Sequence, residues 1–471
     1  NTAVTTIQQS LPQRNISTAG RIAYGYDSRY FAELNFGYNG SERFAKNERF
    51  GFFPSAGVGW MVSNESFMEP LKKTITSLKL KATYGLVGND QIGSLADRFF
   101  YMSQVNMEDG NYGHTFGTEL GTTKPGISIG RYANDLVTWE VAKKLNLGIE
   151  MTLFEDLSIL ADYFTERREN ILQTRQNVPS SMGLASIPQS NLGIAEGKGF
   201  EIELKYQKSF SPDFWLVMNG NFTYATSKYK KIEEPDYSDT PWKSQVGQKL
   251  NQLNGYIAER LFIDEEEVSY SPLQNFGDAT RTMAGDIKYK DINNDDVINS
   301  NDMVPIGYPS TPEIIYGAGL SMGIYRFDLS CFFQGSARSS FMIDVAKVSP
   351  FIDNGQRGLL QDIADDHWSE QNRSFHPFWP RLSENVIRNN AQNSTYWLQD
   401  GTFLRLKTAE IGYTLPEQLT RKIRIKTFRI YLSGVNLLVW SKFKLWDPEM
   451  AGNGLGYPIQ RVYNLGLNLI F

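Results

Sequence analysis

Strict alternation marks the stretch Leu145-Asn146-Leu147-Gly148-Ile149-Glu150-Met151-Thr152-Leu153, in which every odd position is apolar and every even position is polar or glycine. Successive side chains of a β-strand point to opposite faces, so this period of two predicts a strand with one apolar and one polar face. The same pattern recurs in Leu78-Lys79-Leu80-Lys81-Ala82-Thr83-Tyr84 and Phe200-Glu201-Ile202-Glu203-Leu204-Lys205-Tyr206. These stretches predict an all-β, antiparallel fold.

The strand candidates are long enough to cross a membrane. We count about fourteen of them, many with nine or more residues, whereas strands of soluble proteins cluster near five or six residues. A tilted strand needs roughly 9–11 residues to cross a bilayer, and no run of 18 apolar residues offers a spanning helix. Residues 1–471 are therefore predicted to form part of a transmembrane β-barrel. A soluble sandwich or propeller, the alternative, explains the strand lengths poorly.

The connections between strand candidates are of two kinds. Tight turns at 26–29 and 154–156 contrast with much longer stretches elsewhere. Outer-membrane barrels show this asymmetry, with their long loops outside the cell. Long extracellular loops are therefore predicted near 90–135, 171–196, 230–253, 263–309 and 337–395, the last with a short helix around 361–369. A net charge of −5 and the lack of a long basic run argue against a nucleic-acid partner.

Three stretches near the end of the chain are distinctive. They read Ser394-Thr395-Tyr396-Trp397-Leu398-Gln399-Asp400-Gly401-Thr402-Phe403-Leu404-Arg405-Leu406-Lys407, then Ile411-Gly412-Tyr413-Thr414-Leu415-Pro416, and Trp446-Asp447-Pro448-Glu449. Together with Phe53-Pro54-Ser55-Ala56-Gly57-Val58-Gly59-Trp60, they resemble the SusC/RagA family of TonB-dependent outer-membrane transporters.

Leu404 and Leu406 differ in parity from Ile411 and Tyr413, which predicts a β-bulge near Thr408.

The resemblance spans nearly the whole chain and implies the C-terminal portion of a barrel of about 22 strands. It implies that the plug domain and TonB box lie outside this chain, which we expect to start inside a larger protein. The implied function is import of oligosaccharides or oligopeptides across the bacterial outer membrane. The implied partners are a SusD-like surface lipoprotein, the TonB complex acting through the missing N-terminal part, outer-membrane lipid, and a second transporter–lipoprotein pair in a dimer. A porin and an outer-membrane enzyme are the alternatives.

One loop has the oxygen spacing of a cation site. In Asp291-Ile292-Asn293-Asn294-Asp295-Asp296-Val297-Ile298-Asn299-Ser300-Asn301-Asp302, oxygen ligands for Ca²⁺ or Mg²⁺ would come from Asp291, Asn293, Asp295, the Val297 carbonyl and Asp302. Asp296 stands where an EF-hand has glycine, and Asp302 stands where it has a bidentate glutamate. An Asn/Asp-rich turn without an ion is the alternative, and no other cofactor is predicted.

Two further patterns bear on binding or chemistry. Trp368, His376, Trp379 and Arg381 could stack on sugar rings or grip a peptide backbone, with ordinary loop packing as the alternative. Gly126-Ile127-Ser128-Ile129-Gly130 matches the nucleophile elbow of hydrolases but lacks the strand–turn–helix setting that exposes the serine. No catalytic residue is predicted, so the chain is not expected to be an enzyme.

The last nine residues resemble the signal by which outer-membrane barrels are recognised for insertion. Their apolar set is Tyr463, Leu465, Leu467, Leu469 and Phe471. If Phe471 belongs to that signal, its deletion will reduce surface-exposed barrel far more than Asn468→Ser does. Protease-accessible barrel on intact cells measures both variants. Near-equal amounts would leave Phe471 as one more aromatic of the interfacial girdle.

Overall fold

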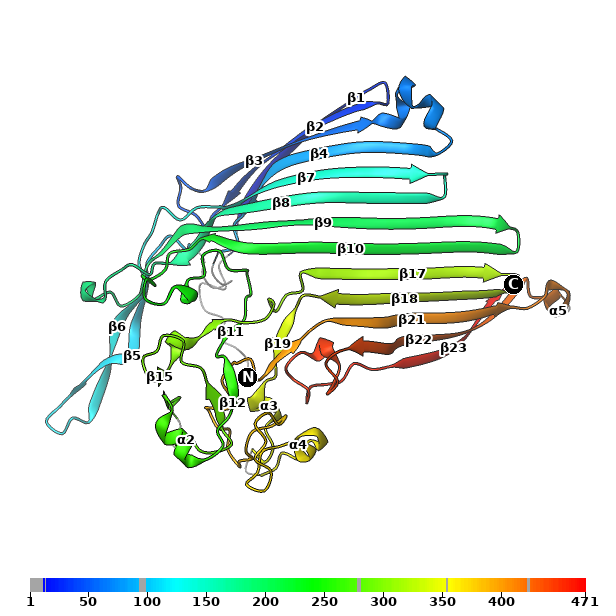
Figure 1. Ribbon diagram of the computed structural model, residues 1–471. Helices are drawn as coiled ribbons and strands as arrows, with labels where there is room; N and C mark the ends of the chain where they lie inside the picture. Colours follow the sequence, from blue (N-terminus) through cyan, green and yellow to red (C-terminus); the bar gives the residue numbers. More distant parts are fainter. Residues whose placement is uncertain (1–11, 13, 93–98, 278–280, 353–354, 422–423) are drawn as a thin grey trace.

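The computed structural model describes residues 12, 14–92, 99–277, 281–352, 355–421 and 424–471. Within these residues, thirteen strands form one curved antiparallel sheet (Figure 1), which confirms the predicted fold class. In spatial order the strands are β1 (Asn15–Tyr26), β2 (Tyr30–Ser41), β3 (Phe50–Met61), β4 (Ile75–Asn89), β7 (Glu140–Leu153), β8 (Leu157–Thr174), β9 (Gln189–Ser211), β10 (Phe214–Lys231), β17 (Ile314–Ile324), β18 (Phe327–Ala337), β21 (Phe403–Thr414), β22 (Thr427–Ser441) and β23 (Val462–Ile470).

The two faces of the sheet differ as the alternation predicts. Leu147 is paired with Ala82 on one side and Tyr163 on the other, so apolar side chains form continuous rows on the outer face. The opposite face carries charge. Its ion pairs across β4, β7 and β8 are Lys79–Glu150 (3.3 Å), Lys81–Glu150 (3.1 Å) and Lys81–Asp162 (3.2 Å).

The apolar band has the height of a bilayer core. On β10, outward positions from Phe214 to Tyr224 span ten residue steps, which is about 34 Å along the strand and roughly 25 Å at the tilt usual in barrels. Farther along β8, the outward positions change to Arg167 and Glu169. Strands β8 to β10, of 18 to 23 residues, therefore continue beyond the membrane.

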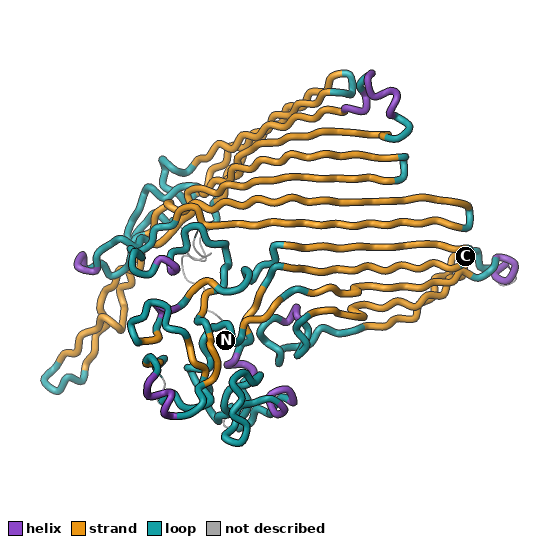
Figure 2. The backbone as a smooth tube through the Cα atoms, viewed as in Figure 1, coloured by secondary structure: helices purple, strands orange, loops and turns teal. Residues whose placement is uncertain are grey.

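Short turns gather at one end of the sheet and long connections at the other (Figure 2). The predicted loop at 171–196 is shorter than expected, because β8 runs to Thr174 and β9 begins at Gln189. Most of the predicted loop at 90–135 is a projecting hairpin of β5 (Gln104–Phe116) and β6 (Thr122–Arg131). A 3₁₀ pair, η1 (Val62–Asn64) and η2 (Ser66–Leu71), lies in the β3–β4 turn at the opposite end.

The remaining connections contain short elements. They are β11 (Asn254–Gly255), β12 (Ala258–Leu261), α2 (Glu265–Tyr270), β13 (Leu273–Gln274), β14 (Ile287–Tyr289), β15 (Val297–Ile298), β16 (Val304–Pro305), β19 (Ser340–Met342), α3 (Val345–Val348), α4 (Gln361–Asp365), β20 (Leu398–Asp400) and α5 (Glu417–Thr420), with 3₁₀ turns η3 (Ser180–Met182), η4 (Pro241–Lys243), η5 (Ser300–Asp302) and η7 (Pro448–Met450). The short helix predicted at 361–369 is α4, which ends at Asp365. In the described part of the chain, no helix combines the length and apolar character needed to span a bilayer.

The predicted bulge near Thr408 is confirmed. Against β22, the register of β21 shifts between Leu406 and Thr408, and against β18 it shifts at the same place. Lys407 is the extra residue, so the parity reverses there and all four apolar residues of the broken pattern share the outer face.

The final strand β23 pairs with β22 along its whole length. Register places Tyr463, Leu465, Leu467 and Leu469 on the outer face, while Phe471 follows the end of the strand. Its role as an insertion signal stays a prediction.

A charge on the outer face should disfavour folding. Leu147→Arg will lower the fraction of folded barrel, because an arginine near the bilayer midplane costs roughly 2–4 kcal/mol. Asn146→Arg, one residue away on the charged face, is the matched control and will leave folding nearly unchanged. Heat-dependent gel mobility of the barrel measures both. Equal loss from the two variants would contradict the assignment of the faces.

Candidate functional site

The long connections fold into one body at the loop end of the sheet. We call residues 254–277, 281–306, 340–352 and 355–400 the loop body. Two backbone hydrogen bonds join its first two ranges to its last two. The Tyr256 N–H donates to the Asn393 carbonyl (2.9 Å), and the Thr395 N–H donates to the Tyr256 carbonyl (3.0 Å). The body has its own apolar core, which Phe443 completes. Its members are Tyr256, Leu261, Ile287, Tyr289, Ile298, Phe341, Ile343, Val345, Val348, Ile363, Trp368, Trp379, Trp397 and Phe443.

Two tryptophans predicted to face substrate lie in this core instead. Trp379 packs on Trp397 with ring centroids 4.9 Å apart, and Trp368 donates its backbone N–H to the Trp379 carbonyl. Both side chains are less than a tenth exposed. The substrate-facing prediction is therefore wrong for Trp368 and Trp379, whose large apolar rings build the loop body. His376 is exposed, so its prediction is neither supported nor excluded by burial.

Arg381, also predicted to contact substrate, is instead held in an ion pair inside the loop body. Its Nε and Nη2 atoms donate to the two oxygens of Asp286, at 2.7 and 3.2 Å. Asp286, which is 1 % exposed, also accepts from Asn390 Nδ2 (2.9 Å) and from the Met283 backbone (2.9 Å). Burial raises the pKa of Asp286, and the bidentate arginine opposes that shift. The pair ties two connections far apart in sequence.

A second ion-pair group holds α2 against β12 and β14 within the loop body. Arg260 binds Glu267 through both terminal nitrogens (2.9 and 2.6 Å), and Lys288 Nζ lies 2.9 Å from the same carboxylate. Burial alone would raise the pKa of Glu267, but hydrogen bonds from Arg260, the Ile263 backbone and Lys288 outweigh it and hold the pKa at about 2. Glu267 therefore stays ionised through mildly acidic conditions. In the core of the loop body, burial raises the pKa of Tyr256 to about 12.

The predicted cation loop is a set of tight turns. Asp291 accepts the backbone N–H groups of Asn294 (2.7 Å) and Asp296 (2.8 Å), and Asp295 accepts that of Val297 (2.9 Å). Asp296 has φ +61°, the left-handed conformation that an EF-hand obtains from glycine. Asn293 Oδ1 is buried and has no hydrogen-bond partner.

Asp302 differs from the last ligand of a cation-binding loop, because backbone N–H groups already occupy its oxygens. It is fully buried, and its two oxygens accept the backbone N–H groups of Ile292 and Asn299, both at 2.8 Å. Among the residues that the structure describes, no three His, Cys, Asp or Glu side chains gather in a group able to hold a metal ion. The Ca²⁺ or Mg²⁺ site stays a prediction for Asp291, Asn293, Asp295, the Val297 carbonyl and Asp302, and both oxygens of Asp302 already accept backbone N–H groups.

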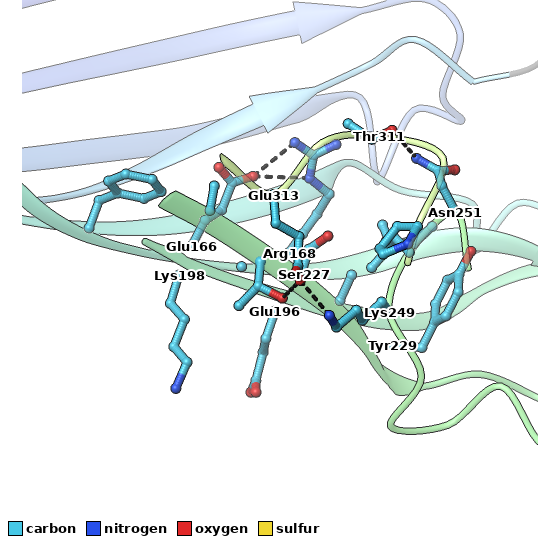
Figure 3. A pocket seen from close by; sticks show the side chains of 18 of the residues that line it. Glu166, Arg168, Glu196, Lys198, Ser227, Tyr229, Lys249, Asn251, Thr311 and Glu313 are labelled. Atoms are coloured by element: carbon cyan, nitrogen blue, oxygen red, sulfur yellow. Dashed lines mark hydrogen bonds and ion pairs between the residues drawn. The ribbon is translucent and has the colours of Figure 1, made fainter. Parts of the chain in front are cut away.

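A cavity of about 580 Å³ lies where β8, β9 and β10 meet the connection before β17 (Figure 3). This volume is in the range of pockets that bind small molecules. Its lining includes Glu140, Phe164, Glu166, Arg168, Glu196, Lys198, Thr226, Ser227, Tyr229, Lys249, Asn251, Thr311 and Glu313. Figure 3 shows Glu196 and Lys198 extending away from the Glu313–Lys249 pair.

Ion pairs fix the polar wall of this cavity. Arg168 donates Nε and Nη2 to Glu166 Oε1, at 3.2 and 2.8 Å. Glu313, almost fully buried, accepts from Thr226 Oγ1 (2.7 Å) and pairs with Lys249 (2.7 Å) and Arg338 (3.0 Å). Charges that neutralise one another leave a wall of donors and acceptors suited to a polar, uncharged or zwitterionic ligand.

The cavity residues were not among the sequence predictions. Alternation fails around 166–169, where both faces of β8 carry charge, and that loss of an apolar face was the available signal. The serine of the hydrolase-like pattern lies elsewhere, on β6, and donates to Asp109 (2.5 Å). A strand setting without a turn or helix gives Ser128 no nucleophile elbow.

Comparison with known proteins gives consistent matches. A family model described as TonB dependent receptor-like, beta-barrel matches residues 8–312. TonB-dependent receptor P3 of Formosa agariphila is 28% identical over 97% of this chain and 45% of its own length. TonB-dependent receptor SusC of Bacteroides thetaiotaomicron is 24% identical over 97% of this chain and 44% of its own length. The chain spans about half the length of the curated relatives it matches.

A solved structure shares the fold. The RagAB peptide importer in its closed-closed state superposes with a TM-score of 0.71 at 21% identity, over 97% of this chain and 48% of that chain. The open-open state gives a TM-score of 0.72. At this level of identity the match establishes the architecture alone.

Calcium should protect the 291–302 loop from proteolysis in the intact receptor. Asp295→Asn removes one of the carboxylates, so half-protection will need about tenfold more Ca²⁺. Asp296→Asn is the matched control, because asparagine tolerates the left-handed conformation and residue 296 is not a predicted ligand. Cleavage within the loop, measured across a calcium titration, checks both. No protection of the wild type would identify an ion-free turn.

Proposed function

We propose a function from the premise that the chain belongs to the TonB-dependent receptor-like β-barrel family. The chain forms the outer wall and the substrate-facing loops of an importer for oligosaccharides or oligopeptides. The resemblance to SusC/RagA proteins seen in the sequence is confirmed by the relative named SusC and by the fold shared with RagAB. Members of this family are outer-membrane proteins, and the relatives are receptors rather than enzymes. The protein is therefore placed in the outer membrane.

The observation that carries the proposal is the position of the cavity. It lies at the loop end of the sheet, where β8 to β10 extend beyond the apolar band, with Glu166 and Arg168 on the inward face. A ligand arriving from outside would meet this polar wall before entering the lumen. Hydroxyl groups of a glycan and amide groups of a peptide both suit neutralised pairs such as Glu166–Arg168, so the wall does not choose between the two classes.

The proposed partners follow from the family. A SusD-like lipoprotein would cover the loop body, whose exposed apolar side chains Tyr270, Leu273 and Phe375 support an interaction surface there. Energy coupling to the TonB complex would use parts of the receptor outside these 471 residues. A dimer of transporter–lipoprotein pairs belongs to the same proposal.

Uptake by intact cells tests the proposal. Cells with the receptor should import a labelled oligosaccharide or oligopeptide, and loss of TonB should abolish that import. Persistent uptake without TonB would indicate a porin instead. Cleaved product outside the cells would indicate an enzyme.

A matched pair of variants tests the cavity itself. Glu166→Gln removes one of the two carboxylates that pair with Arg168, the other being Glu140 at 3.1 Å, and the loss of a charge-assisted contact should raise the half-saturating ligand concentration about tenfold. Glu33→Gln removes an inward-facing carboxylate on β2, which pairs with Arg21 outside the cavity. It should leave uptake unchanged. Equal effects of both variants would contradict a ligand site at the cavity.

A further inference from the structure

The outer face of β1 to β4 has a hollow near the short-turn end. Register places Ala32 beside Val58, and Val58 beside Ala82, so three small or medium side chains lie in one row. The next row toward the turns holds the larger Tyr30, Trp60 and Leu80. The result is an apolar groove of about 420 Å³ in the lipid-facing surface, with Tyr24 on its far side.

A buried carboxylate fixes the aromatic rim of this groove. Glu65, in the β3–β4 turn, accepts from Tyr30 Oη (2.6 Å) and from Trp60 Nε1 (3.0 Å). The Tyr30 hydrogen bond holds the pKa of Glu65 below its usual value, so the acceptor is a carboxylate. With both polar ring atoms engaged, the two rings cannot rotate to fill the hollow.

The groove opens at the level of the lipid headgroups. Tyrosine and tryptophan gather at membrane interfaces because their rings are apolar and their polar ends prefer water. The short turns of an outer-membrane barrel face the periplasm. The Tyr30–Trp60 rim therefore lies at the periplasmic interface, and the hollow behind it lies in the hydrocarbon of the periplasmic leaflet.

Opposite charges stand beside the rim. Arg29, next to Tyr30 in the β1–β2 turn, lies 3.1 Å from Asp27 and 3.4 Å from Glu65. The Asp27 side chain is 58% exposed and that of Arg29 is 36% exposed, so both can bind a further group. A guanidinium suits a phosphate, and a neighbouring carboxylate suits an ammonium group. This pairing complements a zwitterionic headgroup.

We propose that this groove is a binding site for one zwitterionic phospholipid of the periplasmic leaflet. One acyl chain occupies the hollow over Ala32, Val58 and Ala82, while Arg29 binds the phosphate and Asp27 the amine. A second copy of the protein is a poorer occupant, because apolar faces have no hydrophobic drive to associate within lipid. The proposal does not depend on what the receptor imports.

The test is lipid retention by the intact receptor. Receptor purified from its membrane and washed with excess detergent is examined by native mass spectrometry, then supplied with phosphatidylethanolamine or phosphatidylglycerol. The wild type should keep about one phosphatidylethanolamine per chain and prefer it to the anionic lipid. Ala32→Leu fills the hollow and removes the packing contacts of the acyl chain there, so occupancy should fall several-fold.

Control variants separate this site from general lipid contact. Ala318→Leu makes the same change at an exposed, outward-facing alanine of β17 and should retain the lipid. Glu65→Gln removes the carboxylate that holds Tyr30 and Trp60, so the two rings can turn into the hollow, and it should reduce retention while the barrel still folds. Equal retention in Ala32→Leu and the wild type would overturn the proposal. So would a receptor dimer that Ala32→Leu dissociates, since the occupant would then be a second copy.

Discussion

Hydrocarbon offers a backbone no hydrogen-bond partner, and the whole membrane-spanning sheet depends on that constraint. The sheet satisfies N–H and C=O groups strand by strand, which fixes the register and therefore the face of each side chain. A slip of one residue on β7 would turn Glu150 toward lipid and Leu147 toward the lumen. The bulge at Lys407 shows the same rule, since one extra residue restores the outer face on both sides of a broken pattern.

Beyond the membrane the constraint is lifted, and stability has to come from elsewhere. The loop body therefore has its own core of tryptophans and tyrosines, closed by buried pairs such as Asp286–Arg381. Such a pair adds little net stability but leaves a costly unpaired charge when it breaks. It favours one arrangement of two connections that are 95 residues apart at this contact. The cavity beside the loop body consequently has a fixed wall.

The sequence predicted the faces of the membrane strands, which the bilayer constrains, and missed contacts in the loops, which it does not constrain. The faces of β4, β7 and β9 and the bulge near Thr408 followed from alternation, because lipid imposes it. The end of the loop predicted at 171–196 was misplaced, because β8 and β9 carry charge on both faces once they leave the bilayer. Trp379 was misassigned because the sequence pattern around a loop aromatic is the same whether the ring packs on Trp397 or faces a ligand. Long-range contacts determine which of the two occurs, and sequence periodicity carries no information about those contacts.

The lipid-facing surface is itself not uniform, and the physics of the bilayer explains how it can still be specific. Between an apolar wall and an acyl chain there is no hydrophobic gain over bulk lipid, so selective contact requires shape and polar groups at the edge. Ala32 and Ala82 supply shape, and Glu65 preserves it by holding Trp60 and Tyr30 in place. Arg29 and Asp27 supply the polar edge. Without the Glu65 contacts the rings could turn into the hollow. The same apolar residues would then form a surface that contacts every lipid equally well and selects none.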